Sequence, residues 1–137
     1  HGWNADEIPD PQDPLTFQRS KLDWDEVDTG EHARLLGIYR DLIALRRNEP
    51  DLADPWLDHL AIDYDEDRRW IVMRRGRFAI ACNLGAAAAR VPVTGEVVLA
   101  WATPSVEDSA TELPGHSFAI LRAERDHERA RDNLRPV

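Results

Sequence analysis

The chain has 137 residues, of which 42% are hydrophobic, and its 26 acidic and 17 basic side chains leave a net charge of −9. This charge excludes a broad nucleic-acid or anionic-membrane surface, because no basic stripe offsets the repulsion. No apolar run approaches the roughly 20 residues of a membrane span. The single cysteine, Cys82, excludes an internal disulfide and fits a reducing cytoplasm, where we place the protein. Because Cys82 lies in an apolar run, we predict a buried, unreactive thiol.

The N-terminal residues 8–24 form a proline-rich segment, which we call the strap. Prolines hold φ near −65° and push the preceding residue toward extended conformations, so the strap is predicted to be stiff and largely non-helical. A short helical turn is expected over 14–19, with Asp13 as its cap and Pro14 at its first position. From residue chemistry alone, the strap is either a docked connector between domains, the favoured interpretation, or a function-bearing loop.

One long helix follows the strap. Asp28 and Glu31 have the spacing of a capping box, and Pro50 is expected to end the helix. Its apolar residues recur at intervals of three and four, which predicts a broad stripe that needs a partner surface: Leu35, Leu36, Ile38, Tyr39, Leu42, Ile43 and Leu45. Exposing such a stripe is costly, so we predict dimerisation through this helix, or its misplacement, in the isolated chain.

The hydrophobic period changes to two after the helix. Six strands are predicted, at Leu57–Asp63, Arg69–Arg74, Arg77–Leu84, Ala89–Val93, Glu96–Trp101 and Ser117–Arg122. Arg75-Gly76 and Thr94-Gly95 are each expected to form a tight hairpin between antiparallel neighbours. Such local links indicate a mainly β fold, an antiparallel β-sandwich or a Greek-key variant. The charged tail over 124–133 has helical spacing of opposite charges and is predicted to be a solvated or frayed helix.

Two consecutive segments, PDPQDPLTFQRSKLDW and the helical HARLLGIYRDLIALRRNEPDL, resemble the malto-oligosyltrehalose trehalohydrolase family of the α-amylase superfamily of glycoside hydrolases. Beyond Leu52, the asparagine-ended strand at Asn83 and the final element Leu113–Leu121 are similar to the superfamily's C-terminal β-domain in general. The resemblance implies that residues 1–52 are the strap and last helix of an upstream (β/α)8 barrel. Residues 53–137 would then be a C-terminal antiparallel β-domain with a charged tail.

The resemblance also implies an activity for the parent enzyme, which would release trehalose from maltooligosyl trehalose by cleaving the adjoining α-1,4 bond. One carboxyl would act as general acid and another as nucleophile. Because such a barrel needs about 250 residues, we interpret the chain, which starts at His1, as an inactive C-terminal piece with no catalytic residue of its own. Only the strap would approach substrate, through Gln12, Asp13, Phe17 and Arg19.

Two other interpretations stay open. A stand-alone carbohydrate-binding β-sandwich would use flat indole rings, here Trp56, Trp70 and Trp101, although Trp70 and Trp101 lie in strand patterns and are expected to be core residues. Another superfamily enzyme, such as a glucan branching enzyme, would share the fold but not the strap.

The sequence indicates neither a cofactor nor a metal. Asp63-x-Asp65-x-Asp67 begins like an EF-hand loop, but Arg68 stands at the sixth position, where glycine is needed, and Arg74 at the twelfth, where glutamate is needed. The five histidines are scattered without metal-ligand spacing. We therefore interpret the acidic run as a solvated hairpin loop.

Overall fold

The computed structural model describes residues 8–123. The chain divides into two compact units, one ending at Gly37 and the other beginning at Ile38. The helix predicted over 124–133 lies outside the described residues. Within the described residues, no helix is both long enough and apolar enough to cross a membrane.

The strap contains two short helical elements. The α-helix α1 (Pro14–Arg19) has Asp13 at its N-cap and Pro14 at its first position, so the helical turn predicted there is confirmed. A 3-10 turn, η2 (Trp24–Glu26), was not predicted from the sequence, and its start is capped by the Asp23 carboxylate, which accepts the N–H of Asp25 at 3.0 Å. Short polar side chains thus shape both turns by bonding to nearby backbone N–H groups.

The long helix α2 (Gly30–Asn48) begins one residue later than a cap at Asp28 predicts, and its first residue has φ 51°. The stop expected at Pro50 is confirmed, although the chain then makes a further turn, α3 (Pro50–Ala53). Proline is accommodated there because the first helical position has no N–H bond to lose. No residue of α2 is buried, and Tyr39 is 58% exposed.

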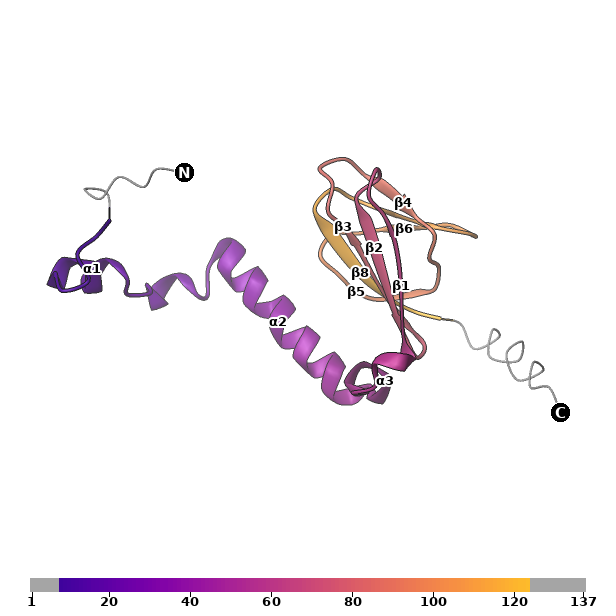
Figure 1. The fold of residues 1–137 in the computed structure, drawn as a ribbon, viewed down its shortest axis with the longest axis horizontal. Coiled ribbons are helices and arrows are strands. Elements are labelled where there is room, and N and C mark those ends of the chain that lie inside the picture. The colour runs from indigo at the N-terminus through magenta and orange to yellow at the C-terminus, as the bar shows by residue number, and fades with distance from the viewer. Residues whose placement is uncertain (1–7, 124–137) are drawn as a thin grey trace. The chain divides into compact units, whose positions relative to one another are not determined.

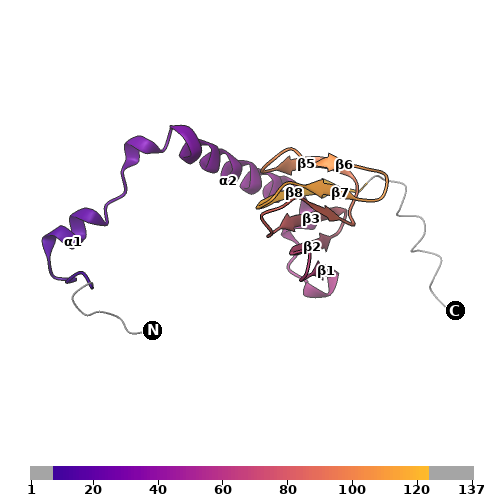
Figure 2. The same ribbon diagram turned by 90° about the horizontal axis from the view of Figure 1, so that it is seen from above.

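The second unit carries two antiparallel sheets (Figure 1). The first has five strands in the order β1-β2-β3-β8-β5, and Figure 2 shows its strands β1, β2, β3 and β8 following one another across the sheet. Its strands are β1 (Leu60–Asp65), β2 (Trp70–Arg75), β3 (Phe78–Asn83), β8 (Ser117–Arg122) and β5 (Glu96–Ala100). The second has the order β4-β7-β6 and consists of β4 (Ala89–Val91), β7 (Thr111–Leu113) and β6 (Ser105–Val106).

The core lies between these two sheets, so the predicted β-sandwich is confirmed. Side chains alternate along a strand, and one set from β2, β3 and β8 points toward the second sheet. The buried cluster combines both sheets: Trp70, Val72, Ala79, Ala81, Val91, Val93, Leu113, Ala119 and Leu121. The face of the five-stranded sheet that carries these residues is therefore its inner face. The residues that alternate with them along each strand lie on the opposite face.

The two predicted hairpins have different outcomes. The link at Gly76 is a tight hairpin, because β2 and β3 pair antiparallel up to Arg75 and Phe78, and Gly76 has φ 53°. The hairpin predicted at Thr94-Gly95 is wrong, because β4 pairs with β7 while β5 pairs with β8, so this link crosses between the sheets. The crossing is held by Thr111, whose hydroxyl donates to the carbonyl of Val93 at 2.6 Å.

The predicted strands need correction at β1, β6 and β7. The first strand begins at Leu60, since Leu57–His59 forms a 3-10 turn, η3. The short strands β6 and β7 were not predicted. The other five predicted strands are confirmed within a few residues at their ends, where helix and strand assignments commonly differ.

Candidate functional site

The four residues expected near substrate lie within one short stretch around α1. The carboxylate of Asp13 accepts the N–H of Leu15 at 2.9 Å, and the N–H of Gln12 donates to the carboxylate of Asp10 at 2.8 Å. The hydroxyl of Thr16 donates to the carbonyl of Asp10 at 2.7 Å. Asp13 therefore shapes the start of α1, whereas the side chain of Gln12 is exposed.

Phe17 and Arg19 are both exposed on α1. The Phe17 ring is 63% exposed, and the ammonium of Lys21 lies 4.7 Å from its centroid, within cation–π range. Arg19 lies in the last turn of the helix. No residue of α1 is buried, so neither side chain belongs to a core.

The three tryptophans considered as sugar platforms have different surroundings. Trp70 is 9% exposed and belongs to the core, as predicted. Trp101 is half-buried, and its backbone N–H donates to the carbonyl of Phe118 at 3.0 Å. Trp56 is 66% exposed. Of these three indoles, only Trp56 offers an open ring face.

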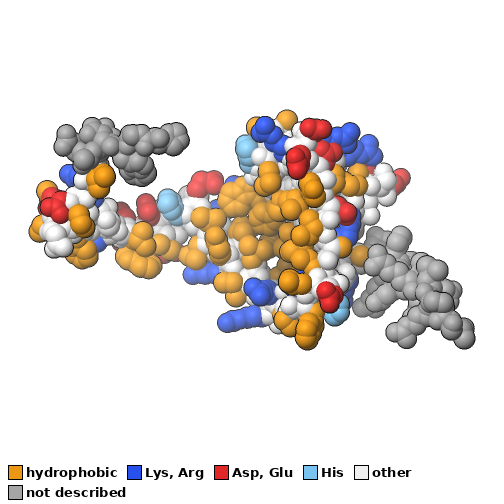
Figure 3. Space-filling view, viewed as in Figure 1, with side chains coloured by type: hydrophobic (Ala, Val, Ile, Leu, Met, Phe, Trp, Pro, Cys, Tyr) orange, Lys and Arg blue, Asp and Glu red, His pale blue; other side chains and the backbone are white. Residues whose placement is uncertain are grey.

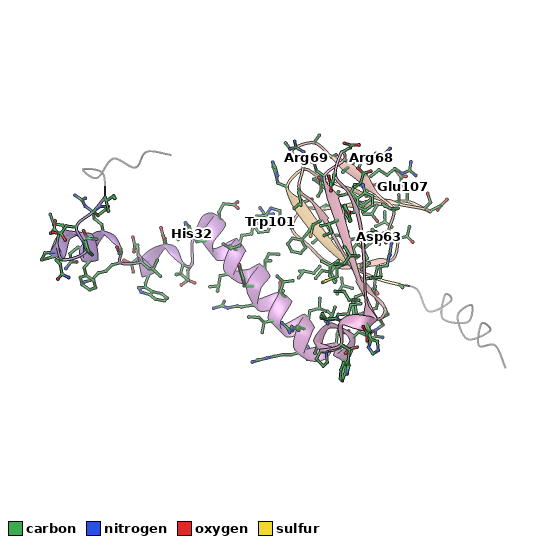
Figure 4. The ribbon with its side chains drawn as sticks, viewed as in Figure 1. His32, Asp63, Arg68, Arg69, Trp101 and Glu107 are labelled. Carbon is green, nitrogen blue, oxygen red and sulfur yellow. The ribbon has the colours of Figure 1, made fainter. Side chains whose placement is uncertain are left out.

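The acidic run closes the β1–β2 hairpin. The Asp65 carboxylate accepts the N–H of Arg68 at 2.8 Å, and Asp63 pairs with the guanidinium of Arg74 at 3.2 Å. Figure 4 labels Asp63 and Arg68 on this hairpin. Over residues 8–123, no group of three or more acidic, histidine or cysteine side chains is placed to hold a metal ion. The carboxylates of this run thus serve the turn and its neighbouring arginines.

A hollow of about 420 Å³ lies beside this hairpin, against the loop of small residues that follows β3. Arg68, Arg69 and Arg90 line it together with Asp67. Arg68 is 3.7 Å from the Asp65 carboxylate, and Arg90 is 3.0 Å from that of Glu107. Figure 4 shows Arg68 and Arg69 at the same end of the sandwich. The positive charge of this rim is thus partly offset, by the carboxylates paired with Arg68 and Arg90 and by Asp67.

Asn83 organises the loop that lines this hollow. It is 1% exposed, and its amide nitrogen donates to the carbonyls of Ala87, Leu113 and Pro114 at 2.8, 3.1 and 2.9 Å. Its amide oxygen accepts the N–H of Gly85 at 2.9 Å. Asn83 thus ties the end of β3 to the segment before β8. The sequence drew attention to this asparagine only through the resemblance.

Cys82 is half-buried on β3, opposite Ile71 of β2 and Phe118 of β8. Burial raises the pKa of its thiol, because desolvation disfavours the thiolate. The thiol is therefore less buried than predicted, but its protonation state is that of an unreactive cysteine.

Comparisons with known proteins find a matching family model and relatives that share one name. The family model described as "Domain of unknown function (DUF3459)" matches residues 55–120. Malto-oligosyltrehalose trehalohydrolase of Mycobacterium tuberculosis (strain H37Rv) is 68% identical over 123 residues, which cover 90% of this chain and 21% of that protein. The enzyme of the same name from Brevibacterium helvolum is 42% identical over 121 residues, covering 88% of this chain and 20% of that protein.

A solved structure supports the fold. The crystal structure of the trehalulose synthase MutB matches with a TM-score of 0.51 and 17% identity, covering 75% of this chain and 21% of that one. At this identity the likeness concerns the fold alone. The chain spans about a fifth of the length of the curated relatives that it matches.

Proposed function

We propose that this chain is the C-terminal, non-catalytic portion of a glycoside hydrolase, a malto-oligosyltrehalose trehalohydrolase. Its resemblance to enzymes of that name is confirmed over 90% of its length. The parent enzyme would release trehalose from maltooligosyl trehalose by cleaving the adjoining α-1,4-glucosidic bond. The observation that carries this proposal is 68% identity to an enzyme of that name, of which this chain covers 21%. The remainder of such a protein has ample room for a (β/α)8 barrel of about 250 residues.

In this proposal the chemistry belongs to the upstream barrel. Glycoside hydrolysis with retention uses two carboxyl groups, one as general acid and one as nucleophile. The carboxylate of Glu49, which is only 14% exposed, is instead an ionic partner of Arg77 and Arg122. Residues 53–137 would support the barrel, and the chain alone would be inactive.

The strap is the part of this chain that we place at the substrate. Gln12 and Arg19 offer polar groups, and Phe17 offers an exposed ring next to a lysine ammonium. A pyranose presents both hydroxyl groups and an apolar face, so an exposed aromatic ring beside amide and guanidinium donors suits it chemically. Asp13 would contribute through the shape of α1 as well as through its charge.

The activity is tested by hydrolysis of maltotriosyl trehalose. The full-length polypeptide is expected to release trehalose, and the 137-residue chain is expected to show no turnover. Turnover by the chain alone would contradict a catalytic centre upstream. A full-length polypeptide that forms branches in a linear glucan, and leaves maltotriosyl trehalose intact, would instead indicate a branching enzyme.

The role of the strap is tested in the full-length polypeptide. Gln12→Ala is expected to lower kcat/KM about tenfold, which corresponds to about 1.4 kcal/mol of transition-state stabilisation. Gln18→Ala is the matched control, since Gln18 is an exposed residue of the same type on α1. Asp13→Asn keeps a good N-cap and removes only the charge, so comparison with Asp13→Ala separates charge from helix capping. Unchanged turnover in Gln12→Ala and Asp13→Asn would remove the strap from the active site.

The alternative of a sugar-binding sandwich has less structural support, since Trp70 is in the core and Trp101 is half-buried. Calorimetric titration of the chain with trehalose and with maltotriose tests it directly. Heat of binding to either sugar would favour the binding module, and its absence would favour the supporting role.

A further inference from the structure

The hollow beside the β1–β2 hairpin has no part in the proposed function. Its walls are the turn between β1 and β2, the start of β4, and residues 85–88, which have the sequence Gly-Ala-Ala-Ala and which we call the alanine loop. Its volume of about 420 Å³ lies within the range of about 300–1,000 Å³ that is usual for small-ligand sites. The hollow is therefore large enough for a small molecule, and the groups on its rim decide which kind.

Arg69 reaches this rim from an unusual backbone conformation. Its φ is 56°, and His116, with φ 49°, is the other non-glycine residue with a positive φ in the described part of the chain. The carbonyl of Arg69 accepts the N–H of Leu84 at 2.8 Å, and the N–H of His116 donates to the carbonyl of Gly85 at the same distance. A Cβ at Gly85 would lie 3.6 Å from the Cβ of Arg69. Since left-handed residues persist where surrounding contacts fix them, the start of the Arg69 side chain is positioned without a ligand.

Arg69 also differs from the other two arginines of the rim in its charge partners. Arg68 pairs with Asp65 at 3.7 Å and Arg90 with Glu107 at 3.0 Å, whereas Arg69 has no ion pair with any residue of the range 8–123. Figure 3 shows basic and acidic side chains next to one another at this end of the sandwich. Solvent reaches both ion pairs, and such pairs contribute little to stability. An anion would therefore find one unpaired guanidinium and two that exchange partners at small cost.

The alanine loop supplies a second set of donors. The N–H groups of Ala86, Ala87 and Ala88 have no hydrogen-bond acceptor among residues 8–123. The loop is nevertheless held in place, because the amide of Asn83 donates to the carbonyl of Ala87 at 2.8 Å and accepts the N–H of Gly85 at 2.9 Å. Successive backbone N–H groups in turns form anion-binding concavities. Guanidinium and amide donors thus lie around the same hollow.

We propose that this hollow is an anion site that takes a phosphate group, from inorganic phosphate or from a small phosphate ester. Arginine suits this ligand, because its planar guanidinium binds two phosphate oxygens in parallel. Inorganic phosphate fills only a fraction of the hollow, so the organic part of an ester has room. Asp67 on the rim and the net charge of −9 oppose anions, so local donors have to provide the affinity. The site goes beyond the proposed function and does not depend on it.

Amide NMR of the 137-residue chain locates the binding. The chain is titrated with sodium phosphate and with glucose 6-phosphate, at constant pH and with ionic strength held constant by chloride. We expect saturable shifts of the Arg69, Ala86, Ala87 and Ala88 amide signals, and none with glucose, which lacks the phosphate. Tighter binding of glucose 6-phosphate would identify an ester as the ligand, and tighter or equal binding of phosphate would identify the inorganic ion.

The decisive variant is Arg69→Gly, because glycine adopts φ 56° without strain and only the side chain is lost. It is expected to weaken phosphate binding about tenfold. Arg47→Ala is the control, since it removes the same charge from an exposed position on α2, and its effect should stay below about twofold. Asp67→Asn removes the opposing carboxylate and is expected to strengthen binding. Calorimetry with the full-length polypeptide should show the same order of the variants.

Three results would overturn the proposal. One is the absence of saturable shifts at the alanine loop with either phosphate compound. Another is an equal loss of affinity in Arg69→Gly and Arg47→Ala, which is the pattern of non-specific attraction. The third is that glucose shifts the same signals as glucose 6-phosphate, which would make the hollow a sugar site. None of these measurements involves the release of trehalose, so a failure of the proposed activity is distinguishable from a failure of the anion site.

Discussion

Glu49 and Arg122 are in contact although 73 residues separate them in the sequence, with 2.9 Å between the carboxylate oxygen and the guanidinium nitrogen. The second carboxylate oxygen pairs with Arg77. The guanidinium groups of Arg77 and Arg122 lie 5.5 and 5.4 Å from the centroid of the Phe78 ring. The carboxylate of Glu49, which directly follows α2, thus contacts Arg77, just before β3, and Arg122, the last residue of β8.

Loss of the Glu49 charge is expected to destabilise the chain. Glu49→Gln keeps the shape but removes two ion pairs, and hydrogen bonds to charged groups contribute about 1.5–3 kcal/mol each when well shielded. Since Arg77 is 47% exposed and Glu49 only 14%, we expect a loss of about 1–2 kcal/mol in the free energy of unfolding, measured with urea.

The control for Glu49 is Glu107→Gln. Glu107 pairs with Arg90 at 3.0 Å, but both side chains are about half exposed, at 48% and 61%. Solvent screens such a pair, so the expected loss is below about 1 kcal/mol. Equal losses in the two variants would show that the Glu49 pairs are no more than surface contacts.

Substitution of Asn83 is expected to be more severe. Asn83→Ala removes the amide that donates to the carbonyls of Leu113 and Pro114, of which that of Pro114 keeps the Ser117 hydroxyl, and opens a cavity, at a cost of about 2–4 kcal/mol. Leu84→Ala, at the next residue, changes a side chain that is 64% exposed and should cost less than about 1 kcal/mol. Urea unfolding of both variants measures the difference, and a mild effect of Asn83→Ala would show that water replaces its bonds.

Two glycine substitutions are expected to act in opposite directions. A Cβ at Gly115 would collide with the backbone carbonyl of Ala86, so Gly115→Ala should lower the thermal midpoint. At Gly37, inside α2, a Cβ meets nothing within 4 Å, and Gly37→Ala should raise helix stability by about 1 kcal/mol. Circular dichroism on heating measures both variants. A shift of the same sign in both would contradict this account.

The Asp54 carboxylate makes stability depend on acidity. The backbone N–H of Trp56, at 2.9 Å, and then the His59 ring, at 2.5 Å, lower the pKa of Asp54 below 3.8. A group whose pKa is lower in the folded state stabilises that state above its unfolded pKa, and the contribution disappears as pH falls through the folded pKa. Asp54→Asn should therefore be less stable than the unmodified chain at about pH 7, and this difference should shrink as the pH falls below the ordinary carboxyl range. A difference that persists in acid would point to another cause.

Local signals in the sequence predicted most of the fold. Pro14 after Asp13, Pro50 after the helical pattern, and the alternation from β1 to β3 each depend on neighbouring residues, and each appears in the structure. The strands β6 and β7 escaped detection because they have two and three residues, too few to show a period.

The features that the sequence did not predict depend on contacts between residues that are far apart in the chain. Thr94-Gly95 has the local signal of a hairpin, but β4 and β5 pair in different sheets, and only tertiary contacts select those partners. The same holds for the bonds of Asn83 and for the Glu49 pairs. For the strap, the helix cap at Asp13 could be read from the residues, whereas the association of Gln12, Asp13, Phe17 and Arg19 with substrate came from resemblance and stays a prediction.

The position of β8 in the sheet has a consequence for protein synthesis. β8 lies between β3 and β5, although it follows all the other described strands in the sequence. A chain still on the ribosome therefore holds β3 and β5 without the strand that joins them. Because β8 is the strand between β3 and β5, the five-stranded sheet can form only after Ser117–Arg122 has been translated and has left the exit tunnel. Contacts between such distant segments also form slowly. Until then its apolar strands are exposed to chaperones and to neighbouring nascent chains.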